Sequence, residues 1–411
     1  MPVFEFMGKR YNNPAELAPD KIGGNCKAFN WMLPCLLLLS GGSLSAQYRA
    51  IDRHAAKAPD SLSRNLPALV DYLCEPAQTE TEKARSLYTW ILQNLTYDDA
   101  ASEQQRRINR SIGDILQRRR GICFDYSKLY EAMCRQAGLK CWSVSGYSRP
   151  KLEAPGPIPS PNHSWNAIRL DGQWKLLDPT WADANSQDEL MARYGADYFL
   201  TPPSLFVFNH LPAVPMWQLL DCPLDSTWFF LRAESLRIDT SRASFAFRDS
   251  IESFFRLPEA EQRLWEANAT YRFYPTNANR KQWAQALIDF AVELDKGTEA
   301  LQTTDSLEAL IGLQAEMLHY CEQAAALTAL RDWQIEFFAG LLLNQAVAYN
   351  QRPNRSKSRS LELNNLQTAK GFLLRAREWL DMLPTDNYYR QYAEKRCVEY
   401  LEVVEFNIGR L

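Results

Sequence analysis

The chain has 411 residues, of which 46% are hydrophobic, 23% charged and 12% aromatic, and its formal net charge is −3. This composition excludes a disordered or collagen-like chain, and the charge gives no sign of the basic face of a nucleic-acid-binding protein. The length predicts about two domains, and nine cysteines are too few for a disulfide scaffold.

A short apolar run near the N-terminus has the order of a secretory signal. Lys21 and Lys27 precede the run Leu36 to Leu39, and small or polar residues follow it up to Ala46. We expect residues 1–46 to be a signal peptide with an N-terminal extension, and the protein to be exported to a periplasmic or extracellular location. The alternative is a buried helix of a cytoplasmic protein. No apolar run of the expected mature chain reaches the roughly 20 residues that a transmembrane helix needs.

Residues 47–235 mix helical and strand patterns and predict an α+β domain. Thr79 and Glu82 have the spacing of a capping box and predict the start of one helix. Ser111 is expected to cap a second, shorter helix. A third helix is predicted to begin at Cys123 and to stop at Gly138.

Cys123 is the strongest candidate for a reactive residue. The first turn of a helix carries unpaired N–H groups and partial positive charge, and both favour a thiolate over a thiol. The alternative is a small buried residue that only fills space.

A hairpin brings a histidine and a carboxylate together. Asp171-Gly172 between two alternating segments predicts a two-residue turn in which Leu170 faces Gln173. In that register His163 and Asp178 are diagonal neighbours on one face, about 7–8 Å apart. A carboxylate in that position can orient an imidazole and stabilise its protonated form. A structural histidine is the alternative.

We expect neither a metal site nor a cofactor. The chain has four histidines, and no Cys-x-x-Cys motif occurs in it.

Residues 236–411 are predicted to be helical throughout. Apolar residues recur at helical spacing, for example at Ala284, Leu287 and Phe290, and again at Leu366, Ala369 and Leu373. The sequence leaves open whether these helices form a bundle or a helical repeat. In either form the domain is a candidate for binding a protein partner.

The motifs around these residues resemble the transglutaminase-like superfamily of cysteine enzymes. They are Arg120-Gly121-Ile122-Cys123-Phe124-Asp125-Tyr126-Ser127, Asn162-His163-Ser164-Trp165-Asn166 and Leu177-Asp178-Pro179-Thr180-Trp181. The later segments Tyr198-Phe199-Leu200-Thr201-Pro202-Pro203 and His210-Leu211-Pro212 resemble the kyphoscoliosis-peptidase branch of that superfamily. The resemblance covers roughly residues 80–220.

This resemblance implies a papain-like domain, with the helix of the nucleophile packed on an antiparallel sheet. Cys123, His163 and Asp178 would be a catalytic triad that attacks a peptide or protein amide bond through a thioester. A peptidase is the first interpretation. Acyl transfer to an amine and a non-catalytic scaffold that retains the triad are the alternatives.

The same resemblance suggests which residues surround the triad. Trp165, Trp181 and Tyr147 are candidates for the substrate cleft. The backbone N–H of Cys123 would be one oxyanion donor, and the second is left unassigned among Trp90, Asn94 and Tyr97.

Overall fold

The computed structural model describes residues 48–103, 109–149, 156–182, 198–231, 245–301, 307–352 and 358–411. The expected signal peptide lies outside the described residues, so its assignment stays a prediction. Among the described helices, none combines the length and the apolar character that crossing a bilayer requires.

The chain divides into two compact units, Met1–Arg256 and Leu257–Leu411. The division lies after the predicted boundary at residue 235, because helix α12 (Phe247–Phe254) packs on the first unit. The ring of Phe254 lies 5.0 Å from that of Trp142 and 6.0 Å from that of Trp217. An aromatic contact therefore keeps this helix with the first unit.

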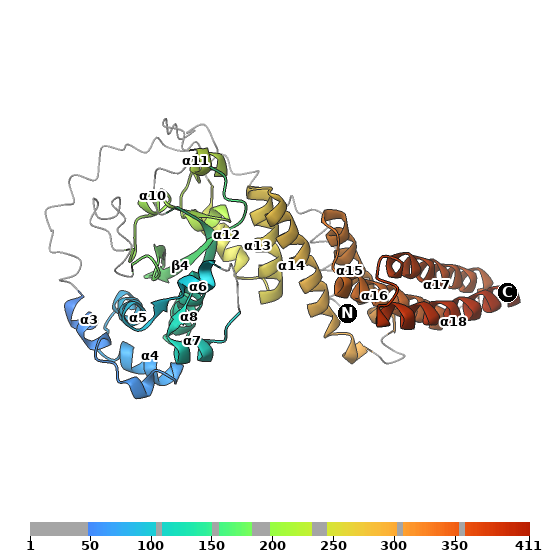
Figure 1. The fold of residues 1–411 in the computed structure, drawn as a ribbon, viewed down its shortest axis with the longest axis horizontal. Helices are drawn as coiled ribbons and strands as arrows, with labels where there is room; N and C mark the ends of the chain where they lie inside the picture. Colours follow the sequence, from blue (N-terminus) through green and yellow to red (C-terminus); the bar gives the residue numbers. More distant parts are fainter. Residues whose placement is uncertain are drawn as a thin grey trace. The chain divides into compact units, whose positions relative to one another are not determined.

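The first unit begins with a layer of helices (Figure 1). These helices are α3 (Arg49–Ala55), α4 (Leu66–Cys74), α5 (Glu80–Asn94), α6 (Asp99–Glu103), α7 (Ile112–Arg118) and α8 (Cys123–Gln136). The predicted capping box of α5 is present, with Glu82 N–H donating to Thr79 Oγ1 at 3.1 Å and Thr79 N–H donating to Glu82 Oε2 at 3.2 Å. Ser111 caps α7 as predicted. Local capping chemistry thus sets where these helices begin.

The helices cover a four-stranded antiparallel sheet with the order β5-β4-β3-β6. Its strands are β3 (Lys140–Ser148), β4 (His163–Leu170), β5 (Gln173–Leu177) and β6 (His210–Pro212). The β4–β5 register pairs Leu170 with Gln173, as predicted from the turn. Asp171 and Gly172 both have positive φ, 49° and 78°, which a turn of this type requires.

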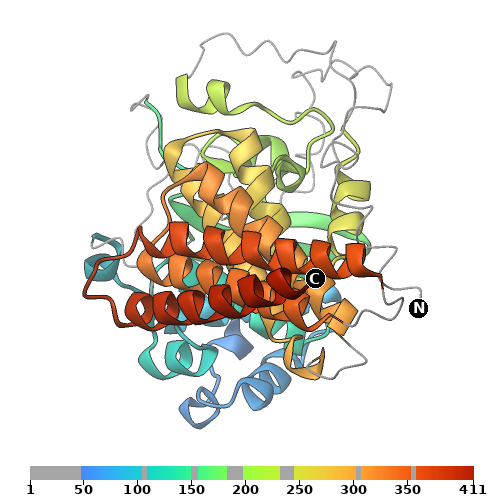
Figure 2. The same cartoon turned by 90° about the vertical axis from the view of Figure 1, so that its right-hand side faces the viewer.

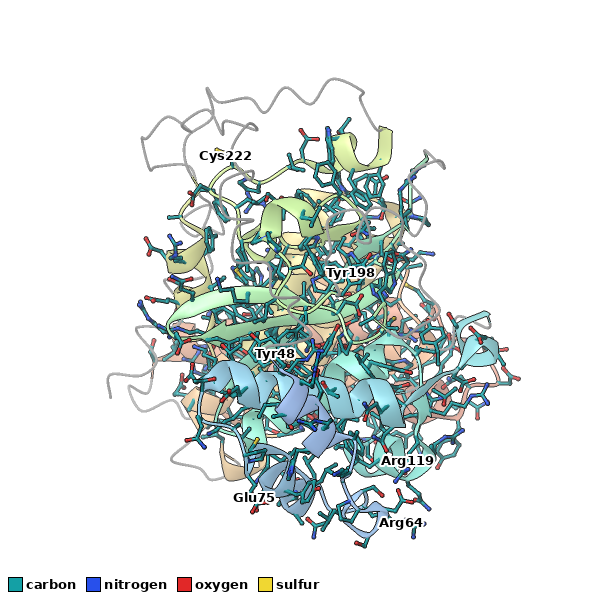
Figure 3. All side chains as sticks on the ribbon, turned by 90° about the vertical axis from the view of Figure 1, so that its left-hand side faces the viewer. Tyr48, Arg64, Glu75, Arg119, Tyr198 and Cys222 are labelled. Atoms are coloured by element: carbon teal, nitrogen blue, oxygen red, sulfur yellow. The ribbon has the colours of Figure 1, made fainter. Side chains whose placement is uncertain are left out.

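Helix α8 packs against β3 and β4, and α5 packs against α8. Figure 3 shows this layering: Arg64, Glu75 and Arg119 mark the helical layer, and Tyr198 lies on the other side of the sheet. The core between helices and sheet includes Tyr88, Trp90 and Leu129, all buried. The predicted α+β fold, with the Cys123 helix packed on an antiparallel sheet, is therefore confirmed.

A second, two-stranded parallel pairing lies beside the start of α8. Strand β1 (Thr96–Tyr97) pairs with β2 (Arg120–Gly121), and Tyr97 is opposite Gly121. This pairing places Tyr97 next to the residues that precede Cys123.

Four short elements complete the described part of the first unit. They are η3 (Asp60–Leu62), α10 (Pro203–Phe206), η4 (Pro215–Gln218) and α11 (Ser226–Leu231).

The second unit is helical, as predicted. Its long helices are α13 (Glu259–Phe273), α14 (Asn277–Asp295), α15 (Leu307–Leu327), α16 (Asp332–Gln351), α17 (Arg359–Leu380) and α18 (Tyr388–Arg410), and the short η5 spans Glu299–Leu301. Consecutive helices pack on one another, and α17 and α18 lie side by side in both views (Figures 1 and 2). The core of this unit, which includes Leu287, Phe338 and Leu380, is made from its own helices.

Candidate active site

Cys123 is the first residue of α8, where the sequence predicts it. Its thiol is free and partly exposed. The turn before it is held by the buried Asp125, whose Oδ2 accepts the Ile122 N–H at 3.0 Å. The thiol therefore lies at the positive end of a fixed helix start.

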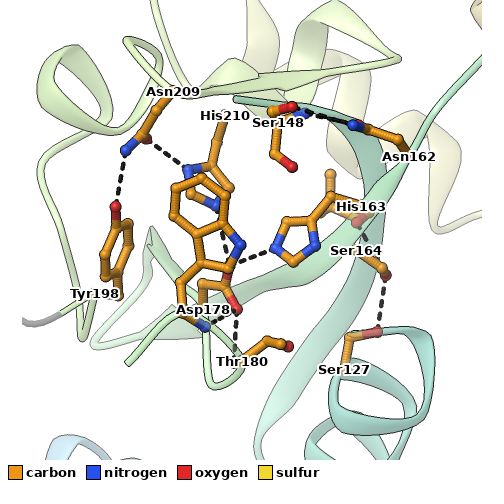
Figure 4. A network of polar contacts seen from close by, with 12 residues as sticks. Ser127, Ser148, Asn162, His163, Ser164, Asp178, Thr180, Tyr198, Asn209 and His210 are labelled. Carbon is orange, nitrogen blue, oxygen red and sulfur yellow. Dashed lines mark hydrogen bonds and ion pairs between the residues drawn. The ribbon is translucent and has the colours of Figure 1, made fainter. Parts of the chain in front are cut away.

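His163 and Asp178 lie together, as the hairpin register predicts. His163 is the first residue of β4, and its Nε2 is 2.6 Å from Asp178 Oδ2 (Figure 4). Both side chains are buried. The second oxygen of Asp178, Oδ1, accepts the backbone N–H groups of Thr180 at 2.7 Å and Trp181 at 3.2 Å. The carboxylate is thus fixed on both oxygens and holds one imidazole nitrogen.

Cys123 and His163 act on each other's ionisation. Burial alone would raise the pKa of the Cys123 thiol, but the charge of His163 and a hydrogen bond with it hold this pKa below its ordinary value of 9.0. The backbone N–H of Ser164 also donates to the sulfur and lowers the pKa further. Since Asp178 engages Nε2 of His163, the other ring nitrogen, Nδ1, is the one that faces the thiol.

Asp178 and Cys123 raise the pKa of His163, whereas His163 lowers the pKa of both. Burial would lower the pKa of His163, but the negative charges of Asp178 and Cys123 raise it to about 10. Burial would raise the pKa of Asp178, but the charge of His163 holds it well below its ordinary range. The interaction therefore favours the state in which the proton lies on His163 and the sulfur is a thiolate.

The three predicted cleft residues differ in exposure. Trp165 and Tyr147 are completely buried, because Trp165 packs over the bare Cα of Gly146 and Tyr147 packs against Phe230. Neither side chain is open to a substrate in this structure. Trp181 is partly exposed, with its ring centroid 5.5 Å from that of His163.

The structure also distinguishes the three candidates for a second oxyanion donor. Trp90 is buried, and the side-chain amide of Asn94 donates to the Trp90 carbonyl at 2.9 Å. The Tyr97 hydroxyl, in contrast, lies 3.2 Å from Ser102 Oγ and close enough to Cys123 for the backbone and the thiol of Cys123 to affect its pKa. Burial, and then the charge of Cys123, raise the pKa of Tyr97, so its hydroxyl stays protonated.

The site contains a residue for which the sequence analysis predicted no role. Nε2 of His210 lies 3.0 Å from Asp178 Oδ2, the oxygen that also contacts His163. His210 belongs to β6, and its segment was identified only through the resemblance of His210-Leu211-Pro212. The scarcity of histidine in the chain, four in 411 residues, is the signal that could have drawn attention to it.

Within the described part of the chain, His163, Asp178 and His210 are a group whose polar atoms are close enough to hold a metal ion. Both histidines, however, point Nε2 at one carboxylate oxygen at hydrogen-bond distance, 2.6 and 3.0 Å. A metal would need those nitrogens as unprotonated ligands directed at the ion instead. As arranged, the three residues form hydrogen bonds with one another.

The family model of the transglutaminase-like superfamily matches residues 67–179, a segment that contains Cys123, His163 and Asp178. The chain carries a transglutaminase-like domain. Kyphoscoliosis peptidase of Homo sapiens is 35% identical over 183 residues, which are 43% of this chain and 27% of that protein. Hillarin of Drosophila melanogaster is 28% identical over 201 residues, 43% of this chain and 24% of that protein. The chain thus spans about a quarter of the length of these relatives.

The chain in a crystal structure of a TGase is 16% identical to this chain, with a TM-score of 0.21. The alignment covers 35% of this chain and 36% of that one. A likeness this distant supports no conclusion about activity.

Proposed function

We propose that the transglutaminase-like domain is a thiol enzyme that cleaves peptide or protein amide bonds. The observation that carries this proposal is the free thiol of Cys123 at a helix start, with a lowered pKa, beside an imidazole that Asp178 fixes at 2.6 Å. These are the parts of an activated nucleophile: a thiolate, a base and a residue that orients the base.

The first half of the reaction forms a thioester. The Cys123 sulfur attacks the amide carbonyl carbon, and the carbonyl electron pair moves to oxygen. As the oxyanion collapses, the C–N bond breaks and the His163 imidazolium gives its Nδ1 proton to the leaving nitrogen. Asp178 keeps the ring in the orientation that this transfer needs.

The second half releases the acyl group. His163, now neutral, removes a proton from water, and the resulting oxygen nucleophile attacks the thioester. The C–S bond breaks and the Cys123 thiolate returns, with His163 protonated again. An amine in place of water would give acyl transfer, the alternative activity, by the same steps.

Tyr97 is our candidate for the second oxyanion donor. Its hydroxyl lies close to the backbone of Cys123, so an oxyanion bound between them would accept from the Cys123 N–H and from the Tyr97 hydroxyl. We expect Tyr97→Phe to lower kcat by roughly 10²-fold, as loss of one such donor does elsewhere. Thiol labelling of Cys123 should persist in this variant, which separates a loss of oxyanion binding from a loss of the nucleophile.

A peptide that carries a thiol-directed reactive group tests the proposal. The wild type should be labelled at Cys123, and Cys123→Ala should lose both the label and amide cleavage, with a fall in rate of roughly 10⁴-fold or more. Cys74→Ala is the matched control and should behave as the wild type. Labelling that persists in Cys123→Ala would contradict the proposal, and a labelled enzyme that cleaves no peptide would favour the scaffold alternative.

The same assay shows whether water or an amine accepts the acyl group. With a fluorescent primary amine present, a peptidase should produce new chain ends, whereas a transferase should produce an amine-labelled protein.

We also propose that the domain acts after export, because the residues before Ala46 have the order of a secretory signal. N-terminal sequencing of the protein from a secreting host should find Gln47 first. Retention of the segment Met32 to Leu39 in the product would contradict export.

A further inference from the structure

Two imidazoles share one oxygen of the candidate triad. His163 Nε2 lies 2.6 Å and His210 Nε2 lies 3.0 Å from Oδ2 of Asp178 (Figure 4). An ionised carboxylate oxygen can only accept hydrogen bonds, so both histidines donate an N–H to it. His210 is placed there by β6, in which it pairs with Ser148 of β3.

His210 is held rigidly and away from water. It is completely buried, and its ring centroid lies 4.3 Å from that of Phe206, 4.4 Å from Trp181 and 5.1 Å from Trp165. Nδ1 of His210 lies 2.6 Å from the side-chain oxygen of Asn209.

The side-chain amide of Asn209 lies 2.8 Å from the Tyr198 hydroxyl, and this contact completes a chain of polar groups that ends at Asp178. The titratable groups that face His210 are therefore His163, Asp178 and Tyr198. The Asn209 oxygen and the carboxylate both only accept hydrogen bonds, so each ring nitrogen of His210 donates an N–H in this arrangement.

We propose that His210 is a positioning residue that acts on His163 through Asp178. Two donors on one oxygen divide its negative charge, so the bond from His210 weakens the pull of Asp178 on the proton of His163. A less basic His163 releases its proton more readily to a leaving amine. The benefit of His210 to catalysis rests on the proposed thiol mechanism. That both histidines share Oδ2 of Asp178 can be tested on the protein without substrate.

The first test is the rate of iodoacetamide modification of Cys123 against pH. His210→Phe keeps an aromatic ring in the cavity and removes the donor, so Asp178 should stabilise the His163 imidazolium more strongly. The thiolate should then form at lower pH, with the apparent pKa of Cys123 lowered by about one unit and labelling at acidic pH faster by about tenfold. His210→Gln retains an N–H donor without the ring, so its profile should lie between those of the wild type and of His210→Phe.

His54→Gln is the matched control, because His54 Nε2 also makes a hydrogen bond, at 2.9 Å to the Tyr72 carbonyl, but away from the triad. Its profile should match the wild type. An unchanged or raised apparent pKa in His210→Phe, or a Gln variant that behaves as the Phe variant, would overturn the proposal.

The second test needs no change at His210. With four histidines in the chain, ¹⁵N-histidine NMR can assign each ring. Two strongly downfield Nε2–H protons are expected, from His163 and His210, and both should be lost in Asp178→Asn. One such proton, or survival of both in Asp178→Asn, would overturn the sharing. Because neither test measures amide cleavage, a failure of the proposed function would not imitate a failure of this inference.

Discussion

Cys123 and His163 each favour the charged form of the other, although each charge is costly to bury. Desolvation opposes the charge on each of Cys123, His163 and Asp178, and the nearby opposite charges and hydrogen bonds together outweigh it in all three cases. The arrangement is therefore interdependent, and removing one charge leaves the others without compensation.

Asp178→Asn tests this interdependence. The pKa of Asp178 is lower in the folded protein than its ordinary value of 3.8, so its charge stabilises the fold above that pH and ceases to do so as the pH falls through the folded value. At pH 7 we expect the variant to lose about 3 kcal/mol of stability and roughly 10³-fold in activity. Urea denaturation from pH 3 to pH 8 should show the difference shrinking from about pH 4 downward. A difference that does not depend on pH would point to packing instead of charge.

At the scale of elements, the start of α8 determines where the thiol lies. Asp125 Oδ2 accepts both the Ile122 N–H at 3.0 Å and a bond from Arg110 at 2.5 Å, and the side chain has no exposure to solvent. Gly121 leaves the room for that carboxylate, because a Cβ there would lie 2.5 Å from Asp125 Cβ. The glycine before the nucleophile is thus required by close packing.

Gly121→Ala should therefore destabilise the protein and slow the labelling of Cys123. Overpacking of this kind costs about 1–3 kcal/mol, to be measured as a shift of the urea midpoint. Gly113→Ala is the control, since a Cβ at Gly113 would meet only Ser111 Oγ at 3.8 Å, and alanine is favoured in a helix. Equal effects of the two changes would show that the crowding at Asp125 does not matter.

At the scale of the whole molecule, the two units have separate cores. The core of the second unit, residues 257–411, includes Ala291, Met317 and Leu342, and all its members come from that unit. We expect the excised segment 257–411 to be helical by circular dichroism and to melt cooperatively. A non-cooperative melt would mean that these helices require the first unit to fold.

Local signals predicted the parts of the site that lie close to one another in sequence. Helical spacing after Cys123 and the stop at Gly138 predicted α8, and the Asp171-Gly172 turn fixed the register that brings His163 to Asp178. His210 reaches Asp178 only because β6 pairs with β3 across a long connection, which no turn signal encodes. The burial of Trp165 and the assignment of α12 to the first unit are likewise decided by packing between distant segments.

The measurement that tests the central claim most directly is the alkylation of each cysteine as a function of pH. Burial raises the pKa of Cys74 to about 11, of Cys397 to about 11 and of Cys321 to about 12, so these thiols serve as internal controls. Cys123 should label first and well below pH 9, and His163→Ala should raise its apparent pKa and slow its labelling at neutral pH. If another cysteine labels first, or if His163→Ala leaves the profile of Cys123 unchanged, Cys123 and His163 do not form an ion pair.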